Sequence, residues 1–316
     1  MNSSTRVAVC SRSFSKNRVL REELQERYSQ VTFNNHGKKL EGDDLVEFLQ
    51  GHDKAITALE ILDRPVLVRL PELKVISKYG VGLDMIDLQA MADLGKSLGW
   101  KGGVNRRSVS ELVIAFAISL LRRIPTAKRE VLSGTWQQKN GGLLSGRTVG
   151  IIGCGNIGKD LVRLLVPWGC TILIHDILDY PDFYSEYNVT PVSLDDLLCE
   201  ADVVTLHVPL DETTTLILDR QHLSMMKPSS ILINAARGGL VDEDALKEML
   251  VNGTLAGAAF DVFSTEPPED RDLLSLDTFM VTPHIGGSSL EAILAMGRAA
   301  IDGLDDHDIP NSHQSV

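Results

Sequence analysis

A glycine-rich hexapeptide at residues 153–158 (Gly-Cys-Gly-Asn-Ile-Gly) restricts the fold of this chain more than any other feature of its sequence. The apolar run before it is typical of a buried strand, and the amphipathic stretch after it, 156–166, predicts a helix. In that setting Gly153 permits the tight turn, Gly155 lets a pyrophosphate approach the backbone, and Gly158 lets the helix pack closely against the strand. The free N–H groups at the helix start also favour phosphate. The hexapeptide therefore predicts a Rossmann-type dinucleotide site.

An acidic residue ends the next predicted strand of this region. Asp176 lies 23 residues after Gly153. A carboxylate about 20 residues beyond the first glycine is placed to accept hydrogen bonds from the adenine ribose hydroxyls. The same carboxylate would repel a 2′-phosphate, and residues 177–180 contain no Lys or Arg to offset it. The sequence therefore predicts NAD rather than NADP as the cofactor.

Short apolar runs alternate with longer amphipathic stretches on both sides of the hexapeptide. This order is typical of βαβ units and a mainly parallel sheet. The chain has 316 residues, which suggests two domains at about 150 residues each. The expected fold class is α/β, with two doubly wound parallel-sheet domains. The expected strands are 6–10, 31–33, 55–59, 74–77, 148–152, 172–175, 203–207, 231–234, 256–260 and 280–282, and the expected helices include 16–29, 43–50, 87–94, 193–199, 242–251 and 290–304.

One predicted helix, residues 108–121, is apolar nearly all round over its first three turns. Ser108 and Glu111 have the spacing of a capping box, with Ser108 as the N-cap. Pro125 predicts that the helix stops or kinks near Ile124. A helix without a polar face is expected to be buried between layers or between subunits. The polar tail from residue 305 to residue 316 is expected to fray.

Composition excludes several classes of partner. The 31 basic and 43 acidic residues give a formal net charge of −12, which repels phosphate backbones and anionic lipid headgroups. We therefore expect neither a nucleic acid nor a membrane as partner. The first residues lack the apolar core of a secretory signal. The four cysteines lie far apart without a Cys-x-x-Cys pair, so we expect a reducing cytoplasmic location, no disulfide framework and no metal site.

Three polar residues follow separate predicted strands in the second half of the chain: Arg237, Glu266 and His284. The carboxyl ends of parallel strands form the edge at which ligands bind. A guanidinium can hold a carboxylate, an imidazole can exchange a proton with a hydroxyl group, and a carboxylate on its other nitrogen can stabilise the imidazolium. The trio suits hydride transfer at a secondary alcohol. Each residue alone is also common as a surface, turn or packing residue, and spacing does not prove that the three converge.

These residues lie in a series of motifs that resembles the D-isomer-specific 2-hydroxyacid dehydrogenases, and within them the phosphoglycerate dehydrogenase-like branch. The likeness covers roughly residues 50–305 in the right order. The matching stretches are 77–84 (Ser-Lys-Tyr-Gly-Val-Gly-Leu-Asp), 108–112 (Ser-Val-Ser-Glu-Leu), the hexapeptide, 206–210 (Leu-His-Val-Pro-Leu), 234–239 (Asn-Ala-Ala-Arg-Gly-Gly), 257–263 with Glu266-Pro267-Pro268, and 283–287 (Pro-His-Ile-Gly-Gly).

The resemblance implies a domain arrangement and an activity. A Rossmann NAD-binding domain over residues 101–287 would be inserted into a flavodoxin-like substrate domain made of residues 1–100 and 288–316. The chain would use NAD to interconvert a small D-2-hydroxy acid and its 2-oxo acid, as D-3-phosphoglycerate dehydrogenase and hydroxypyruvate reductase do. It would form a homodimer, with the 108–121 helix in the interface.

Two alternatives remain among the relatives that this likeness includes. Some, of the C-terminal-binding-protein corepressor type, act mainly as NADH-responsive scaffolds that bind proteins. Others oxidise a non-carboxylate anion such as phosphite with a similar trio. Formate is disfavoured, because formate dehydrogenases pair the histidine with Gln where this chain has Glu266.

The resemblance also assigns roles to residues. Arg237 would bind the substrate carboxylate and polarise the 2-oxo group. His284 would be the general acid in reduction and the general base in oxidation, and Glu266 would pair with it. Backbone groups of Val81 and Gly82 would meet the substrate carboxylate. The cofactor would contact Gly153, Gly155, Asn156, Ile157, Gly158, Asp176, His207, Val208, Pro209, Ala235, Ala236, Arg237, Asp261, His284 and Gly287.

The sequence departs from the family pattern at two places that bear on the substrate. Met85 stands where the family often has Asn, and Trp100-Lys101-Gly102 stands where it often has Asn-x-Pro. Both departures leave the identity of the substrate open. Lys78 matches a position at which the phosphoglycerate branch often has an Arg facing the substrate phosphate. It is either a contact for an anionic substrate tail or a surface lysine.

Overall fold

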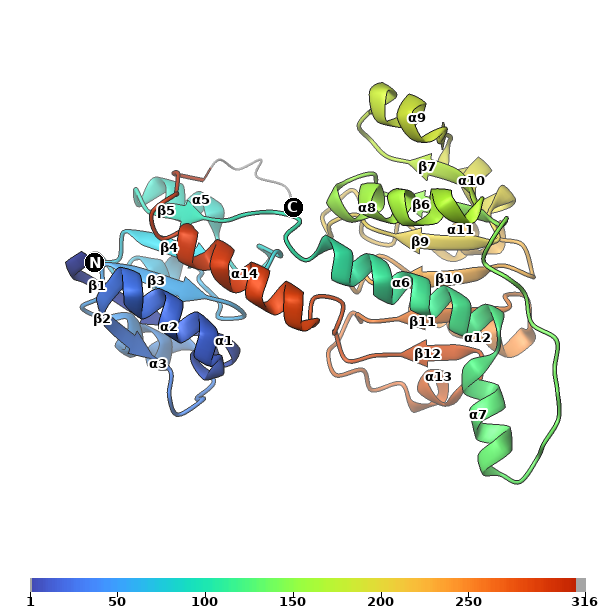
Figure 1. The fold of residues 1–316 in the computed structure, drawn as a ribbon, viewed down its shortest axis with the longest axis horizontal. Coiled ribbons are helices and arrows are strands. Elements are labelled where there is room, and N and C mark those ends of the chain that lie inside the picture. Colours follow the sequence, from blue (N-terminus) through green and yellow to red (C-terminus); the bar gives the residue numbers. More distant parts are fainter. Residues whose placement is uncertain (1, 311–316) are drawn as a thin grey trace. The chain divides into compact units, whose positions relative to one another are not determined.

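The structure is a computed structural model that describes residues 2–310, and it divides into two compact units. Unit 1 comprises the described residues up to Asn105 and from Ser289 onward, and unit 2 comprises Arg106–Ser288. The divisions fall after Asn105 and Ser288, where the sequence suggested residues 100 and 287. In Figure 1 the ribbon of unit 1 is blue to cyan with a red terminal helix, and that of unit 2 is green to orange.

Unit 1 contains a five-stranded sheet in the order β2-β1-β3-β4-β5, in which every pair is parallel. This is the strand order of the flavodoxin-like doubly wound fold. The strands are β1 (Asn2–Val9), β2 (Tyr28–Phe33), β3 (Lys54–Thr57), β4 (Val75–Lys78) and β5 (Ser97–Gly99). The helices are α1 (Arg12–Lys16), α2 (Arg18–Arg27), α3 (Gly42–Leu49), α4 (Arg64–Leu67), α5 (Leu88–Asp93) and α14 (Leu290–Asp302).

The last helix, α14, returns to unit 1 and packs against α2. A Cβ atom on Gly297 would overlap the side chain of Leu20, so this helix approaches α2 more closely than any larger residue would allow. Arg298 adds an ion pair to Glu23 on α2, with an Nη2–Oε1 distance of 2.8 Å. Glycine at this crossing therefore lets the C-terminal helix complete the core of unit 1.

The prediction that residues after 305 fray is wrong for the described part of the tail. The backbone of Asp308 pairs with that of Leu98, with N···O distances of 2.7 and 3.2 Å. The hydroxyl of Tyr28 donates to the Asp305 carboxylate at 2.5 Å. Local polarity suggested a free end, but these partners come from distant strands and do not show in a local pattern. Residues 311–316 lie outside the described residues.

Unit 2 contains a seven-stranded parallel sheet in the order β12-β11-β10-β9-β6-β7-β8, which includes the Rossmann order. The strands are β6 (Thr148–Ile152), β7 (Thr171–His175), β8 (Thr190–Pro191), β9 (Val203–Leu206), β10 (Ile231–Asn234), β11 (Gly257–Phe260) and β12 (Phe279–Val281). The helices are α6 (Arg106–Leu121), α7 (Ile124–Leu132), α8 (Asn156–Leu165), α9 (Pro181–Tyr187), α10 (Leu194–Glu200), α11 (Arg220–Ser224), α12 (Glu243–Asn252) and α13 (Arg271–Ser275), with a short 3-10 turn at Val166–Trp168. The predicted α/β class with two doubly wound parallel sheets is confirmed.

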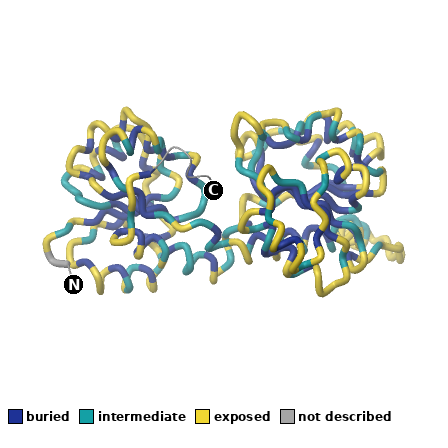
Figure 2. The backbone as a smooth tube through the Cα atoms, turned by 90° about the horizontal axis from the view of Figure 1, so that it is seen from above, coloured by how far each residue is buried: buried dark blue, intermediate teal, exposed yellow. Residues whose placement is uncertain are grey.

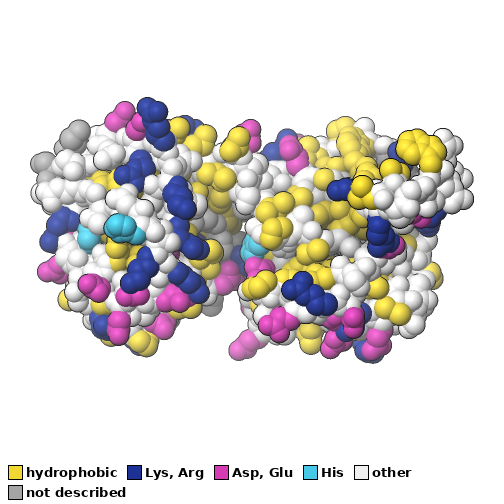
Figure 3. All heavy atoms as spheres, turned by 90° about the horizontal axis from the view of Figure 1, so that it is seen from below, with side chains coloured by type: hydrophobic (Ala, Val, Ile, Leu, Met, Phe, Trp, Pro, Cys, Tyr) yellow, Lys and Arg dark blue, Asp and Glu magenta, His cyan; other side chains and the backbone are white. Residues whose placement is uncertain are grey.

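Hydrophobic residues cover both faces of each sheet, and Figure 2 shows the strands as the buried part of each unit. Parallel strands covered by helices on both faces read as continuous apolar runs, which is why the short runs in the sequence predicted them. The surface in Figure 3 carries Lys and Arg side chains interspersed with Asp and Glu. Among residues 2–310, no helix is both long and apolar enough to cross a bilayer.

The structure corrects the predicted start of the apolar helix and agrees with its predicted end at Leu121. Helix α6 begins at Arg106, so Ser108 lies inside the first turn and is not the N-cap. An ion pair with the neighbouring helix α8 holds this earlier start, because Arg107 donates to both oxygens of Asp160, at 2.9 and 3.0 Å. At the other end, Arg123 adopts a left-handed conformation and Pro125 lies in the first turn of the new helix α7. Pro125 therefore begins a helix as well as ending one.

We predict that Arg107→Gln lowers the free energy of unfolding by about 2 kcal/mol, because it leaves a buried carboxylate without its cation. Asp160 is only 4% exposed. Burial alone would raise the pKa of Asp160, but the hydrogen bonds and charge of Arg107 outweigh it and lower the pKa. Urea unfolding at neutral pH measures the loss.

The lowered pKa also sets the pH dependence of this difference. A carboxylate with a lowered pKa stabilises the fold above its unfolded value near 4, and that stability disappears as the pH falls. The gap between the native protein and Arg107→Gln should therefore shrink below about pH 4. Lys128→Gln, which removes an exposed charge on α7, is the control and should unfold like the native protein. An equal loss in both variants would show that the ion pair is not the cause.

Candidate active site

The structure brings two of the three predicted catalytic residues into direct contact. Glu266 lies in the loop after β11, and His284 lies in the loop after β12. Nδ1 of His284 is 2.9 Å from Oε2 and 3.2 Å from Oε1 of Glu266. The histidine side chain is 52% exposed. With Nδ1 held by the carboxylate, the imidazole presents Nε2 for proton exchange with a ligand.

Arg237, the third member of the trio, lies in the loop after β10, the strand next to β11. The side chain of Asn234 shapes this loop, because it donates to the Arg237 carbonyl at 2.8 Å and accepts from the Ala236 N–H at 3.1 Å. The guanidinium of Arg237 donates to the Ala236 carbonyl at 2.7 Å. Its loop also touches the loop of Glu266, since a Cβ atom on Gly238 would overlap the backbone of Phe263.

A buried carboxylate fixes the loop that carries His284. Asp261 is 1% exposed and accepts hydrogen bonds from the Thr282 hydroxyl at 2.5 Å, the Ile285 N–H at 2.7 Å and the Gly286 N–H at 2.7 Å. His284 itself has a φ of 54°, in the left-handed region that non-glycine residues rarely adopt. The sequence suggested Asp261 as a cofactor contact. The structure adds a positioning role, because the Asp261 carboxylate holds the loop that carries His284.

The glycine-rich loop has the geometry that a pyrophosphate needs. Gly153 has a φ of 101°, and a Cβ atom there would lie 2.5 Å from the His207 carbonyl oxygen. A Cβ atom on Gly158 would overlap the Gly153 carbonyl, so this glycine allows the close approach of helix and strand. A Cβ atom on Gly155 would meet nothing within 4 Å. Open space in front of Gly155, at the start of α8, fits the diphosphate of a dinucleotide.

Asp176 reaches the glycine-rich loop from the end of β7. One of its carboxylate oxygens accepts from the Cys154 N–H at 2.5 Å, and the other accepts from the Leu178 N–H at 2.8 Å. The carboxylate is therefore held beside the loop. The remaining cofactor candidates follow β9, β10 and β12 at the same edge of the sheet: His207, Val208, Pro209, Ala235, Ala236 and Gly287.

A second histidine at this edge differs from His284 in its environment. Burial lowers the pKa of His207 to about 3. Its Nε2 lies 3.0 Å from the Thr205 hydroxyl, and its Nδ1 is buried without a hydrogen-bond partner among the described residues. His207 is therefore neutral at physiological pH and cannot supply a proton as an imidazolium. Of these two histidines, only His284 is placed to act as the acid.

The substrate candidates of unit 1 lie at the end of β4 and just after it, and both departures from the family pattern contact them. Lys78 is 4% exposed, so it is not a surface lysine. Its ammonium donates to the Ala58 carbonyl and lies 3.0 Å from the Met85 sulfur. The indole N–H of Trp100 donates to the Val81 carbonyl at 2.9 Å. Met85 and Trp100 thus shape the segment that the sequence associated with substrate binding.

A groove of about 470 Å³ in unit 1 lies beside this segment, and we call it the unit 1 groove. Its lining combines exposed apolar side chains with three carboxylates. The lining residues are Leu59, Ile61, Asp63, Asp84, Met85, Ile86 and Asp87. Within the described part of the chain, no group of three or more His, Cys, Asp or Glu side chains is arranged to hold a metal ion.

Comparisons with known proteins agree with this geometry. Residues 114–286 match the family model described as "D-isomer specific 2-hydroxyacid dehydrogenase, NAD binding domain". The chain is 38% identical over 237 residues to a hydroxypyruvate reductase from Thermotoga maritima, which covers 73% of this chain and 76% of that protein. It is 36% identical over 233 residues to a D-3-phosphoglycerate dehydrogenase from Mycobacterium bovis, which covers 73% of this chain but 44% of that protein.

A solved structure is also similar over nearly the whole chain. The TT0316 protein from Thermus thermophilus has a TM-score of 0.84 and 31% sequence identity, covering 97% of this chain and 99% of that one. The family resemblance seen in the sequence, and NAD as the cofactor type, are confirmed by these matches. The chain therefore belongs to the D-isomer-specific 2-hydroxyacid dehydrogenases, a family of NAD-dependent oxidoreductases that interconvert 2-hydroxy acids and 2-oxo acids.

Proposed function

We propose that this chain reduces a short, unphosphorylated 2-oxo acid to the D-2-hydroxy acid, and catalyses the reverse oxidation. The contact between His284 and Glu266 carries the proposal. Arg237 binds the substrate carboxylate and polarises the 2-oxo group. Bound NADH supplies the hydride, and His284 gives its Nε2 proton to the oxygen that becomes the hydroxyl group. Glu266 orients the ring and stabilises the imidazolium.

The surroundings of Lys78 support an unphosphorylated substrate. The ammonium is buried, and a backbone carbonyl and a thioether of unit 1 already lie in contact with it. A phosphate entering the unit 1 groove would meet apolar side chains and three carboxylates. Burying a dianion against apolar surface and like charges is costly. An uncharged side chain on the substrate meets neither penalty.

We expect the purified protein to oxidise NADH with glyoxylate, hydroxypyruvate or 2-oxoisocaproate. The best of these should exceed 3-phosphohydroxypyruvate in kcat/KM by about tenfold or more, because the phosphate lacks a partner. The decay of NADH absorbance measures each rate. A preference for the phosphorylated acid would overturn the choice of substrate class. NADH binding without turnover of any acid would favour a protein-binding scaffold, and reduction of NAD by phosphite alone would favour the phosphite reaction.

His284→Ala in the same assay separates the chemistry from the substrate class. Its kcat should fall by about 10²-fold or more, with little change in the KM for NADH. The exposed His36→Ala in unit 1 is the matched control. Reduction requires protonated His284, so the rate of reduction by the native protein should fall as the pH rises. The rate of oxidation, which requires the neutral imidazole, should rise with pH. Full activity of His284→Ala would remove this residue from the mechanism.

We also propose that Asp176 selects NAD by holding the adenine ribose hydroxyls. Asp176→Asn keeps one oxygen, which can accept from one of the two N–H groups, and it removes the charge. The ratio of kcat/KM for NADH to that for NADPH should therefore fall by about tenfold or more, since repulsion of the 2′-phosphate is lost. Asp179→Asn, a change at an exposed neighbouring carboxylate, should keep the native ratio. Unchanged preference in Asp176→Asn would contradict the proposed role.

We propose that the chain is a homodimer in which a second copy covers α7 and the segment after it. Helix α7 has no buried residue. Large apolar side chains there are highly exposed, including Leu132 at 77% and Trp136 at 86%. Figure 3 shows hydrophobic side chains gathered on the surface of unit 2. Large apolar side chains exposed along one segment are typical of interfaces, and the family resemblance implies two copies. The sequence placed the interface at 108–121, and α7 directly continues that helix.

Light scattering after gel filtration checks this assembly. The native protein should have twice the chain mass of 34.6 kDa. The double variant Leu132→Ser, Trp136→Ser should shift towards a single chain, because it removes two large apolar contacts. Leu290→Ser, at an equally exposed leucine of α14, is the control and should keep the native mass. A native protein with the mass of one chain would contradict the dimer.

We place this chemistry in a reducing, cytoplasmic compartment. All four cysteines are free thiols. Burial raises the pKa of Cys154 to about 11, which keeps this thiol protonated and unreactive beside the cofactor loop. Recovery of the chain in the soluble cytoplasmic fraction of cells checks the location.

A further inference from the structure

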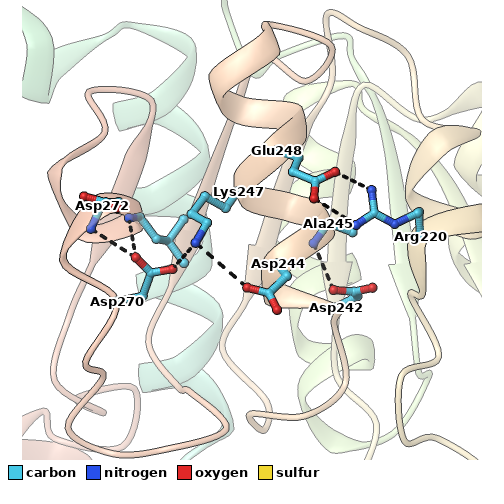
Figure 4. Close-up of polar contacts among 9 residues, drawn as sticks. Arg220, Asp242, Asp244, Ala245, Lys247, Glu248, Asp270 and Asp272 are labelled. Carbon is cyan, nitrogen blue, oxygen red and sulfur yellow. Dashed lines mark hydrogen bonds and ion pairs between the residues drawn. The ribbon is translucent and has the colours of Figure 1, made fainter.

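The loop that carries Glu266 is fastened to helix α12 by charged side chains that the catalytic trio does not include. We call residues 263–270 the Glu266 loop. Near its start, the carboxylate of Glu243 accepts from the Ser264 N–H at 2.9 Å. At its end, the ammonium of Lys247 donates to the Asp270 carboxylate at 2.6 Å. Figure 4 shows Lys247 pointing from α12 towards Asp270, with Asp244 on its other side.

The middle of the Glu266 loop has little packing of its own. Residues 264–267 and 269 are exposed. A hollow of about 190 Å³ separates this part of the loop from the neighbouring helices. Exposed loops with few apolar contacts move readily unless polar contacts fix their ends. The Glu266 carboxylate also accepts from the Phe263 N–H at 3.2 Å, at the start of the loop. The two attachments to α12 add to this contact in setting where the loop, and with it Glu266, can lie.

The Lys247–Asp270 attachment keeps its charges over a wide pH range. The hydrogen bond to Asp270 raises the pKa of Lys247, and the hydrogen bond to Lys247 lowers the pKa of Asp270. Asp270 also caps α13, because it accepts from the N–H groups of Asp272 and Leu273, both at 3.0 Å. The end of the Glu266 loop is thus joined to α12 and to α13. The side chains of Lys247 and Asp270 are only 28% and 35% exposed, respectively.

Helix α12 is itself a fixed support. Asp242 caps its first turn through the Ala245 N–H at 2.9 Å, and Leu246 and Leu250 are buried in the core of unit 2. A bidentate pair between Arg220 and Glu248, at 2.5 and 3.1 Å, ties the helix to α11 (Figure 4). The chain enters α12 directly from the loop that contains Arg237. One helix therefore anchors the loops of two catalytic residues.

We propose that Glu243 and Lys247 are positioning residues, which hold the Glu266 loop so that the Glu266 carboxylate stays on Nδ1 of His284. This inference rests on the proposed function, because it concerns the same pair. Two carboxyl-bearing residues border the imidazole from the end of β11: Glu266 faces its Nδ1, and Asp261 holds its backbone. When Glu266 drifts away, the imidazolium loses its facing carboxylate. Reduction, which needs that imidazolium, then slows most at the higher pH values.

The test compares pH profiles of reduction, with the best acid of the panel, in four variants. Glu243→Ala and Lys247→Met should lower kcat by about five- to twenty-fold, because the acid is no longer held in its productive geometry. They should also move the midpoint of the profile to lower pH, with the KM for NADH within about twofold of the native value. Glu243→Gln retains a side-chain oxygen for the Ser264 N–H and should restore both kcat and the midpoint.

Glu248→Gln is the control for a merely structural effect. Glu248 lies on α12, as Glu243 and Lys247 do, and its substitution breaks the ion pair with Arg220 of α11. It should therefore lower the unfolding midpoint and leave the pH profile unchanged. An unshifted profile in both Glu243→Ala and Lys247→Met, or equal damage from Glu243→Gln and Glu243→Ala, would overturn the inference. If Glu243→Ala has the kcat and pH profile of the native protein while His284→Ala is inactive, only this inference is contradicted. If His284→Ala is active, the proposed function itself is contradicted.

Discussion

The parallel register of β10, β11 and β12 is the constraint on which the active site depends. Asn234 lies beside Phe260, and Phe260 lies beside Val281, so the three strands end level with one another. Each strand is followed at once by a loop, and each loop carries one member of the catalytic trio. Because backbone hydrogen bonds hold the three strands in register, and β10 and β11 are buried throughout, the loops start from fixed points. Convergence of residues far apart in the chain follows from this register.

Close backbone contacts then leave the loops little freedom. A side chain at Gly238 would overlap the backbone of Phe263, so the Arg237 loop must lie against the start of the Glu266 loop. Asp261 binds three donors of the His284 loop from within the protein. The His284 backbone is strained at a φ of 54°, which its surroundings must balance. These contacts, together with the attachments of the Glu266 loop to α12, favour the contact between the imidazole and the carboxylate.

The positions that the sequence predicted correctly are those at strand ends. Gly153, Asp176 and His284 each follow an apolar run, and the structure has them after β6, β7 and β12 at one edge of the parallel sheet. The features that it missed depend on partners far along the chain. Helix α6 begins early because Arg107 meets Asp160, and the tail is ordered because Asp308 meets Leu98. Neither partner can be found from local spacing, because the pairing follows from the completed fold.

Lys78 shows that prediction from the sequence has the same limit for the substrate class. Its place in the motif indicated a cation near the substrate, and its burial, its carbonyl partner and its contact with Met85 change what that cation can offer. The motif indicates a cation at this position, but the surrounding residues determine whether the charge of that cation is available to a ligand. A nearby departure from the family pattern, Met85 in place of Asn, thus bears directly on the substrate class.

The two histidines at the edge of the unit 2 sheet show how environment assigns chemical roles. Both follow strands of the same sheet, and both have motif positions associated with the cofactor. His207 loses its ability to hold a proton because burial lowers its pKa to about 3 and no carboxylate faces it in the hydrogen bonds of its ring. His284 is half-exposed and faces Glu266 at 2.9 Å. An acid that must load and release a proton in each turnover needs both solvent access and a partner that stabilises its charged form. Exposure and a facing carboxylate, rather than residue type, therefore support the proposal that His284 is the acid.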